Sequence, residues 1–486
     1  MSLLQLLSLE AHIAARSFAD YVAGTGLRLG VTGLSRAGKT VFITALVQNL
    51  VRKSRLPVLS VMREQRLTRA VLQPQPDDAV PRFAYEDHLA ALGGDNRHWP
   101  QSTRRISELR LTIEFDSARV WRKGPSQLTV DIVDYPGEWL LDLPLLGKSY
   151  AQWSRETLES SAHANRAMLA ADWRGFTLPL DPSARADEDT ARKAADLFTA
   201  YLRACRADRY ALSTLPPGRF LLPGDMEGSP ALTFAPLALA SDEIVAGTLA
   251  AMMERRYEAY KALIVRPFFR DHFARLDRQI VLVDALAALN SGPAAVRDLE
   301  TALADILAAF RAGRSGLLST LFRPKIDKIL FAATKADHLH HSSHDRLEAI
   351  LRHLTGRAIA RVEGVGARVD VIAMAAIRAT REAAVKQGAG LPELDAIVGT
   401  PIAGERIDGD VFDGIAEAAI FPGELPKDPK LVFRGDALAL SEAAAAYRFV
   451  RFRPPAAKLG ADGLPEPPPQ IRLDRALEFL LGDRLR

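Results

Sequence analysis

The chain has 486 residues, of which 48% are hydrophobic and 25% are charged, and its formal net charge is +4. This composition is typical of a soluble globular protein, and so small a charge favours an ordinary solvated surface over a nucleic-acid partner. Cys205 is the single cysteine, which excludes an intramolecular disulfide and fits a reducing cytoplasm. No uncharged apolar run reaches about 18 residues, so no transmembrane helix is expected.

Residues 3–22 carry apolar side chains at helical spacing and predict an amphipathic helix. They lack the basic start and the cleavage site of a signal peptide. Such a helix either packs on its own domain, which is favoured here, or docks on a membrane surface or a partner.

A strand is predicted at residues 27–32 and a helix at 41–47. Between them, residues 33–40 read Gly-Leu-Ser-Arg-Ala-Gly-Lys-Thr, which matches the phosphate loop G-x-x-x-x-G-K-[ST] in the strand–loop–helix setting that the motif requires. The Lys39 ammonium is expected to reach the β- and γ-phosphates, and the Thr40 hydroxyl to bind Mg²⁺. Arg36 either stabilises charge on the transferring phosphoryl group or lies on the surface. The expected phosphate contacts are Gly33, Ser35, Arg36, Ala37, Gly38, Lys39, Thr40 and Val41.

Residues 50–107 are predicted to form a long first switch region. A hydroxyl that binds Mg²⁺ should lie shortly before the next strand. Ser102, Thr103 and Ser107 are the candidates, and Thr103 is favoured, with Arg104 beside it. Trp99 either packs over the nucleotide or anchors the loop.

Strands are predicted at 109–115 and 128–133, joined as an antiparallel hairpin by a turn at 123–125. Residues 134–137 then read Asp-Tyr-Pro-Gly, a switch motif in which Asp134 holds Mg²⁺ and the Gly137 amide senses the γ-phosphate. Glu138 stands where many small GTPases carry the glutamine that orients the attacking water. Because the γ-phosphate repels a carboxylate, hydrolysis is predicted to be slow or to use another group. The expected catalytic residues are Lys39, Thr103, Glu138 and Arg36.

Residues 140–276 are rich in Ala, Leu, Arg and Glu in a helical pattern and predict an inserted all-α subdomain. Three further strands follow at 279–284, 328–333 and 369–373, separated by helices near 294–313 and 342–357, and the chain ends in a helix at 474–481. This alternation predicts an α/β fold of the P-loop NTPase type, with a mostly parallel sheet covered by helices on both faces. Its domain is expected to comprise residues 1–139 and 277–486.

Residues 334–337 read Thr-Lys-Ala-Asp directly after a predicted strand. The Asp337 carboxylate can accept hydrogen bonds from N1–H and the 2-amino group of guanine, a donor pair that adenine lacks. The Lys335 stem can cover the face of the base, and His338 can touch its edge. The sequence therefore favours GTP or GDP over ATP.

Two further segments follow this motif. Backbone amides of Ala375, Ala376 and Ile377 are expected to receive guanine O6. His338, His340, His341 and His344 crowd one loop, but no nearby cysteine or carboxylate completes an evident metal-binding set, so a solvated loop is favoured.

The phosphate loop, residues 134–139, residues 334–338 and the tail at 471–483 together resemble the YcjX-like P-loop GTPases, over nearly the whole chain. The resemblance implies a cytoplasmic bacterial protein that binds GTP and GDP with Mg²⁺ in the envelope-stress (phage-shock) response. A membrane protein or the inner-membrane surface is then a candidate partner. The nucleotide contacts it implies are Ser35, Gly38, Lys39, Thr40, Trp99, Ser102, Thr103, Lys335, Asp337, His338 and Ala376.

The motifs leave two alternatives open. One is an ATP-specific P-loop enzyme, against which Asp337 argues. The other is an interaction module that a nucleotide stabilises and that hydrolyses it negligibly, a reading that Glu138 supports.

Overall fold

A computed structural model describes residues 26–34, 36–75, 77–94, 96–101, 105–119, 124–207, 210–309, 326–363, 366–386, 393–407, 409–433 and 447–486. The predicted amphipathic helix at 3–22 lies outside these residues. Within them, no helix is both long and apolar enough to cross a membrane.

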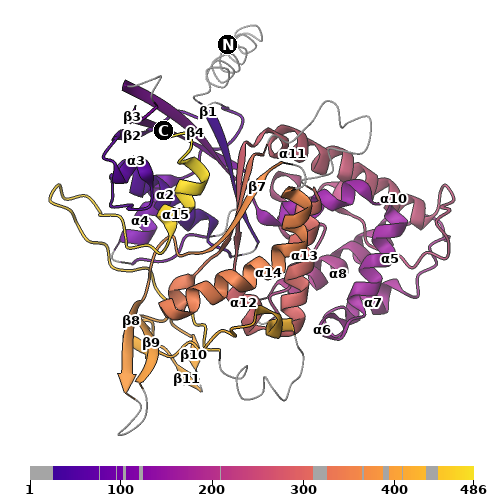
Figure 1. The fold of residues 1–486 in the computed structure, drawn as a ribbon. Helices are drawn as coiled ribbons and strands as arrows, with labels where there is room; N and C mark the ends of the chain where they lie inside the picture. Colours follow the sequence, from indigo (N-terminus) through magenta and orange to yellow (C-terminus); the bar gives the residue numbers. More distant parts are fainter. Residues whose placement is uncertain are drawn as a thin grey trace.

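The described chain is built on a seven-stranded sheet in the order β2-β3-β4-β1-β5-β6-β7 (Figure 1). Strands β1, β4, β5, β6 and β7 run parallel to one another, and β3 is antiparallel to both β2 and β4. This confirms the predicted fold class and the predicted hairpin. The strands are β1 Gly26–Gly33, β2 Leu67–Gln73, β3 Ser107–Ser117, β4 Gly124–Asp134, β5 Arg278–Val283, β6 Lys328–Ala333 and β7 Arg368–Ala373.

The central strands are apolar because both of their faces are buried. On β6, Phe331 packs into one hydrophobic core and Leu330 into the other, since successive side chains of a strand point to opposite faces. Every residue of β5 and β6 is buried, which explains runs of apolar residues rather than an alternating pattern.

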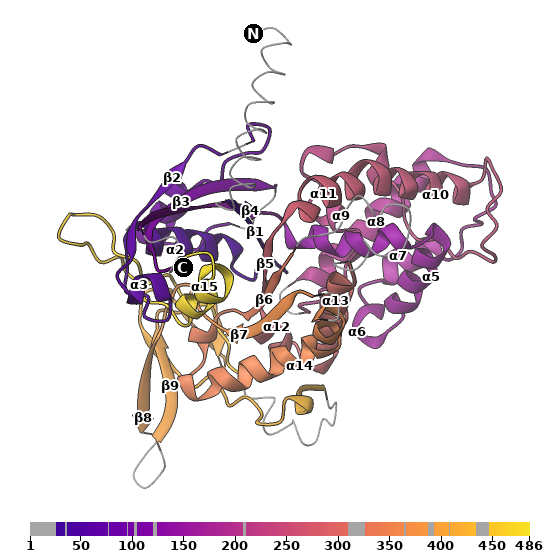
Figure 2. The same ribbon diagram turned by 45° about the horizontal axis from the view of Figure 1, so that its top comes forward.

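Helices cover the two faces as two separate layers (Figures 1 and 2). One layer packs on the core that includes Leu330 and contains α2 Lys39–Val51, α3 Ser60–Arg63, α4 Tyr85–Gly93 and α15 Leu473–Leu481. The other layer packs on the core that includes Phe331 and contains α12 Ala285–Asn290, α13 Pro293–Ala309 and α14 His344–Glu363. The last helix of the chain therefore shares a core with the helix that follows the phosphate loop.

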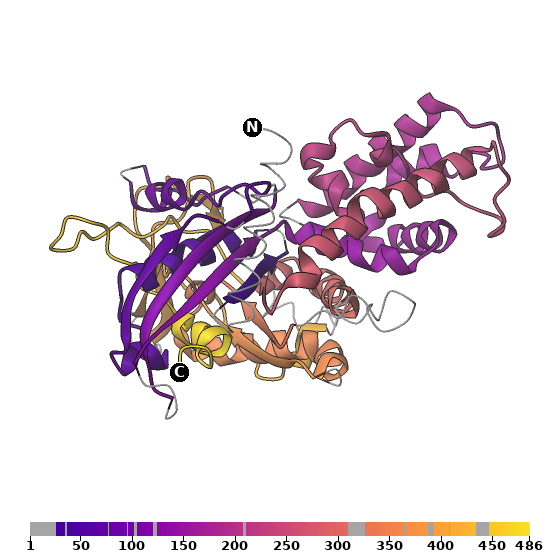
Figure 3. The same ribbon diagram turned by 90° about the horizontal axis from the view of Figure 1, so that it is seen from above.

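All described elements between β4 and β5 are helical, and they gather to one side of the sheet (Figure 3). Their centre is aromatic: the rings of Trp153 and Tyr257 stack with centroids 5.2 Å apart, and Trp173 stacks on Tyr201 at 5.2 Å. These elements are η1 Gly137–Gly147, α5 Tyr150–Ser161, α6 Ala164–Ala167, α7 Ala171–Thr177, α8 Glu188–Arg206, α9 Gly218–Leu221, η2 Gly224–Met226, η3 Pro230–Leu232, α10 Leu249–Tyr260, η4 Lys261–Val265, α11 Arg266–Asp271 and η5 Phe273–Arg275. We refer to those after η1, from α5 to η5, as the helical segment.

A small antiparallel sheet that the sequence does not predict follows β7. It has the order β12-β9-β8 and contains β8 Arg381–Lys386, β9 Glu393–Gly399 and β12 Ala418–Ile420. A two-stranded ribbon, β10 Arg406–Ile407 with β11 Asp410–Val411, lies between β9 and β12 in the chain. Three short helical turns complete the description: η7 Ala336–His338, η8 His341–Ser343 and η9 Pro429–Phe433.

Candidate functional site

The phosphate loop joins β1 to α2 through two residues in the left-handed region, Arg36 with φ 60° and Gly38 with φ 84°. A side chain at position 38 would meet no atom within 4 Å, so backbone conformation rather than space calls for glycine there. Lys39 and Thr40 form the buried first turn of α2, and the Lys39 ammonium donates to the Gly33 carbonyl at 3.3 Å. The helix N-terminus thus faces the loop, an arrangement that suits a phosphate.

The switch motif lies directly against this loop. A Cβ built on Gly137 would stand 1.9 Å from the carbonyl oxygen of Gly33, so only glycine fits there. Asp134 ends β4 and is buried, with Val31 of β1 and Ser107 of β3 as its partners in register. The structure therefore places Ser107, one of the three candidate hydroxyl residues, beside the switch aspartate.

A cavity of about 370 Å³ opens above the phosphate loop. It joins segments that lie more than 300 residues apart in the chain and brings together most of the predicted contacts. Its lining comprises Arg36, Ala37, Gly38, Lys39, Thr40, Val41, Phe42, Trp99, Pro100, Gln101, Leu282, Thr334, Lys335, Asp337, His338, Met374, Ala375, Ala376, Ile377, Ile402, Arg451 and Phe452.

Asp337 lines this cavity and is oriented by hydrogen bonds. Its side chain is buried, and one carboxylate oxygen accepts the Ala379 amide at 2.9 Å. The Thr380 hydroxyl donates to the Asp337 carbonyl. These bonds orient the carboxylate before any ligand arrives, which lowers the entropic cost of recognition.

Lys335 and His338 flank this aspartate. Lys335 adopts φ 61°, and its ammonium pairs with Asp284, which also caps α12 by accepting the Ala287 amide at 3.1 Å. The ring of His338 meets that of Phe452 edge to face at 5.3 Å. Burial lowers the pKa of His338 below its ordinary value, so its ring is neutral at neutral pH.

Part of the cavity lining comes from C-terminal residues that sequence analysis missed. Trp99 lines the cavity and donates from Nε1 to the Phe452 carbonyl at 2.6 Å, so it anchors its loop, while its packing over a nucleotide stays a prediction. Ile402 and Arg451 also line it. No local motif identifies these residues, because folding brings them to the cavity from a distant part of the chain.

One predicted role needs correction. The Ala375 amide donates to the Ile471 carbonyl at 3.0 Å, and the Ile471 amide donates back at 2.8 Å. Ala375 lines the cavity, but its N–H is engaged in this pairing with the C-terminal tail and does not receive guanine O6. Ala376 and Ile377 stay the candidates.

A family model described as "YcjX-like family, DUF463" matches residues 27–485. The chain belongs to the YcjX-like family. A protein of Escherichia coli (strain K12) named "Ras-like GTPase YcjX" is 41% identical over 478 residues, which are 95% of this chain and 96% of that protein. A protein of Shewanella oneidensis with the same name is 34% identical over 494 residues, 97% of each chain. The resemblance drawn from the motifs is confirmed.

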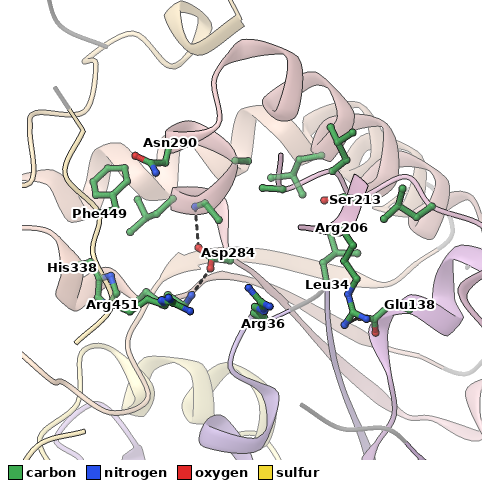
Figure 4. Close-up of a pocket in the computed structure, with 18 of the residues that line it drawn as sticks. Leu34, Arg36, Glu138, Arg206, Ser213, Asp284, Asn290, His338, Phe449 and Arg451 are labelled. Carbon is green, nitrogen blue, oxygen red and sulfur yellow. Dashed lines mark hydrogen bonds and ion pairs between the residues drawn. The ribbon is translucent and has the colours of Figure 1, made fainter. Parts of the chain in front are cut away.

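A second cavity of about 260 Å³ adjoins the first (Figure 4). The two cavities share the lining residues Arg36, Lys335, His338 and Arg451. Burial lowers the pKa of Arg36, and the guanidiniums of Arg451 and Arg206 lower it further. The guanidiniums of Arg36 and Arg451 therefore make the border between the two cavities cationic, which suits an anionic part of a ligand.

Glu138 lies at the other end of this second cavity. Its side chain is 6% exposed and pairs with Arg206 of α8 at 2.5 Å. A Cβ on Gly218 would stand 2.0 Å from the Glu138 carbonyl oxygen, so the helical segment contacts both its side chain and its backbone. Contacts with the helical segment therefore hold Glu138, the residue after the switch glycine, in place.

Two oxygen donors near the phosphate loop are of the kind that magnesium prefers. The Thr40 hydroxyl and the Asp134 carboxylate are hard ligands, and they follow the carboxyl ends of the neighbouring parallel strands β1 and β4. Among the described residues, the lining of the two cavities includes neither Asp134 nor Gly137. Four predicted site residues, Ser35, Ser102, Thr103 and Arg104, lie outside the described residues.

Proposed function

We propose that the chain binds GTP and GDP and hydrolyses GTP slowly, as a magnesium-dependent molecular switch. The observation that carries the proposal is the single cavity that runs from the phosphate loop to the oriented carboxylate of Asp337. The names of the two YcjX relatives support it. Guanine recognition by Asp337 distinguishes this function from that of an ATP-specific enzyme.

Each residue has a defined task in this proposal. The loop amides and the Lys39 ammonium bind the phosphates and neutralise charge that develops on the γ-phosphoryl oxygens. Thr40 and Asp134 would hold Mg²⁺, with Thr103 as a third ligand, and the ion would neutralise phosphate charge. Arg36, which lines both cavities, would stabilise transferring charge.

The position of Glu138 supports the proposal of slow turnover. Its carboxylate pairs with Arg206 and is therefore turned toward the helical segment, away from the role that glutamine has in fast GTPases. That contact also joins the switch motif to the domain that we propose for residues 140–276. The core of the nucleotide domain would then comprise residues 1–139 and 277–486.

The same pair supports a second candidate, an interaction module that a nucleotide stabilises with negligible hydrolysis. Single-turnover measurements with labelled GTP separate the two candidates. A rate well above that of GTP in buffer supports the switch, and an equal rate supports the module.

From the family resemblance alone we also propose a role in the bacterial envelope-stress response, with a membrane protein or the inner-membrane surface as partner. Co-sedimentation with inverted inner-membrane vesicles, with GDP or a GTP analogue, tests it. Binding that depends on the nucleotide supports the role, and no binding in either state contradicts it.

The guanine assignment is tested by replacing Asp337 with asparagine. The wild-type chain should bind GTP and GDP at least 100-fold more tightly than ATP in a titration calorimeter, because the carboxylate pairs with two guanine donors. Asp337→Asn should lose about 2–3 kcal/mol of GTP affinity, roughly 30- to 150-fold, and gain affinity for xanthosine triphosphate, whose 2-oxo group accepts a hydrogen bond. Equal affinity of the wild-type chain for ATP and GTP would contradict guanine recognition by Asp337.

A further inference from the structure

Two neighbouring histidines lie beside two acidic side chains at the edge of the small sheet. His341 Nδ1 is 2.7 Å from Glu382 Oε2, and His340 Nε2 is 3.6 Å from the same oxygen. The ligating atoms of His340, His341 and Glu382 all lie within 4.8 Å of one another. His340 presents its other nitrogen, Nδ1, to Asp395 at 3.2 Å.

These side chains come from three elements that meet in space. The histidines lie at η8, just before α14, whereas Glu382 is on β8 and Asp395 on β9. Glu382 pairs in register with Ile397, two residues from Asp395, so the two carboxylates share one face of the hairpin. Figures 1 and 2 both show this hairpin beside one end of α14.

We propose that His340, His341 and Glu382 form a binding site for a divalent transition-metal ion, with zinc as the best match. Imidazole nitrogen and carboxylate oxygen are ordinary zinc ligands, and two histidines with one glutamate leave a fourth position for water. Ligands around tetrahedral zinc lie about 3.4 Å apart, since each bond is about 2.1 Å long. The separations of 2.7 Å and 3.6 Å lie on either side of that value.

Asp395 can serve as the hydrogen-bond partner that orients a metal-binding histidine. A histidine that binds a metal through one nitrogen usually donates its other N–H to a carboxylate, which fixes the tautomer and the orientation of the ring. The contact of His340 Nδ1 with Asp395 has this arrangement, and the Ser342 hydroxyl lies 2.9 Å from the same nitrogen. His341 is 68% exposed and His340 only 15%, so an ion can enter from solvent and find one ligand already positioned.

The bound ion would tie the loop after Asp337 to the start of the small sheet. Ala379 and Thr380, which hold Asp337, directly precede β8. The ion would therefore stabilise the segment that orients the aspartate. The metal site itself does not depend on which nucleotide the larger cavity binds.

The test uses the full-length chain, stripped with a chelator and without nucleotide. Titration with Zn²⁺ should give one site per chain, and Co²⁺ should give the visible absorption of a four-coordinate ion. Glu382→Gln and His340→Ala should each weaken Zn²⁺ binding at least 100-fold. Asp395→Asn, which removes only the orienting partner, should weaken it 10- to 100-fold.

His163→Ala removes an exposed histidine of the helical segment and is the matched control, with unchanged affinity expected. Zinc should also raise the melting temperature of the wild-type chain and not that of Glu382→Gln. Circular dichroism checks that each variant is folded. If Glu382→Gln or His340→Ala is unfolded, His341→Ala takes its place, because His341 is the most exposed of the three ligands. Zinc binding that Glu382→Gln and His341→Ala both leave unchanged would overturn the proposal, as would no binding by the wild-type chain.

Discussion

Gly137 is the residue at which the switch motif and the phosphate loop contact each other most closely. A methyl group on Gly137 would lie 1.9 Å from the Gly33 carbonyl oxygen and 3.1 Å from the Leu34 nitrogen. Backbone atoms cannot turn away as a flexible side chain can, so Gly137→Ala must displace one of the two segments. Such overpacking costs about 1–3 kcal/mol.

We expect Gly137→Ala to weaken GTP binding by roughly 5- to 150-fold, the equivalent of that cost. Calorimetric titration with a non-hydrolysable GTP analogue measures the loss. Gly147→Ala is the matched control, because it ends the same η1 turn and an added methyl there meets nothing within 4 Å. Equal affinities of the two variants would show that the contact does not shape the site.

The Glu138–Arg206 pair is a second interaction between single residues that spans two parts of the chain. Arg206→Ala removes the partner of a carboxylate that is 6% exposed. A buried charge that has lost its oppositely charged partner destabilises a protein by about 3 kcal/mol. We therefore expect a lower unfolding free energy in urea, with part of the loss restored in the Glu138→Gln/Arg206→Ala double variant. Arg203→Ala, at an exposed position of the same helix, should change stability by less than about 0.5 kcal/mol.

At the scale of elements, α15 is fastened to the sheet by a buried cluster of charges. Asp483 binds Arg278 of β5 through both oxygens at 2.7 Å and Lys328 of β6 at 2.6 Å. Both basic side chains are almost fully buried. Burial opposes ionisation of Asp483, but its bonds with Arg278 and Lys328 outweigh that effect and hold its pKa well below the ordinary value.

Replacing Asp483 with asparagine should destabilise the fold by about 3 kcal/mol at pH 7, since it leaves the buried Lys328 ammonium without its carboxylate and Arg278 with Asp327 alone. A lowered folded pKa stabilises the chain above the unfolded pKa, near 3.9, and this contribution is lost as pH falls further. The difference between wild type and Asp483→Asn in urea unfolding should therefore shrink from pH 5 to pH 3.

Asp462→Asn is the control for this series, because its pair with Arg52 is exposed to solvent and contributes little to stability. A difference between wild type and Asp483→Asn that stays constant with pH would contradict the assignment.

Elements whose pattern is local were predictable from the sequence. The strands β1, β4, β5 and β6 are short apolar runs. The spacing of its glycines, lysine and threonine is enough to recognise the phosphate loop. Strand β2 and the small sheet escaped prediction because apolar and polar residues mix along these strands without a sustained alternation, and few of their residues are buried.

The same limit applies to the candidate sites. Lys39 and Asp337 belong to motifs, whereas Arg451 and Phe452 reach the nucleotide cavity from a segment without one. Glu382 lies 41 residues beyond His341, and only the pairing of β8 with β9 brings it to the histidine loop. Contacts of this kind follow from the whole fold and leave no signature in a short window of sequence.

At the scale of the whole molecule, close backbone contacts lead from the phosphate loop into the helical segment. Gly33 contacts Gly137, and the next residue, Glu138, contacts Gly218 at the start of α9. Beyond it, the Arg219 guanidinium lies 3.3 Å from the centroid of the Trp139 ring. Packed backbone transmits displacement because it has little room to deform.

Hydrogen exchange should therefore differ between the GDP and GTP-analogue states in two regions, η1 Gly137–Gly147 and α9 Gly218–Leu221. In Gly218→Ala, whose methyl would lie 2.0 Å from the Glu138 carbonyl oxygen, the difference should persist in η1 and weaken in α9, because the two backbones are forced apart. Gly175→Ala, a site in α7 with nothing within 4 Å, should behave as the wild type. If the wild-type helical segment exchanges identically in both states, it does not respond to the nucleotide, and the contacts at Glu138 serve only to hold that residue in place.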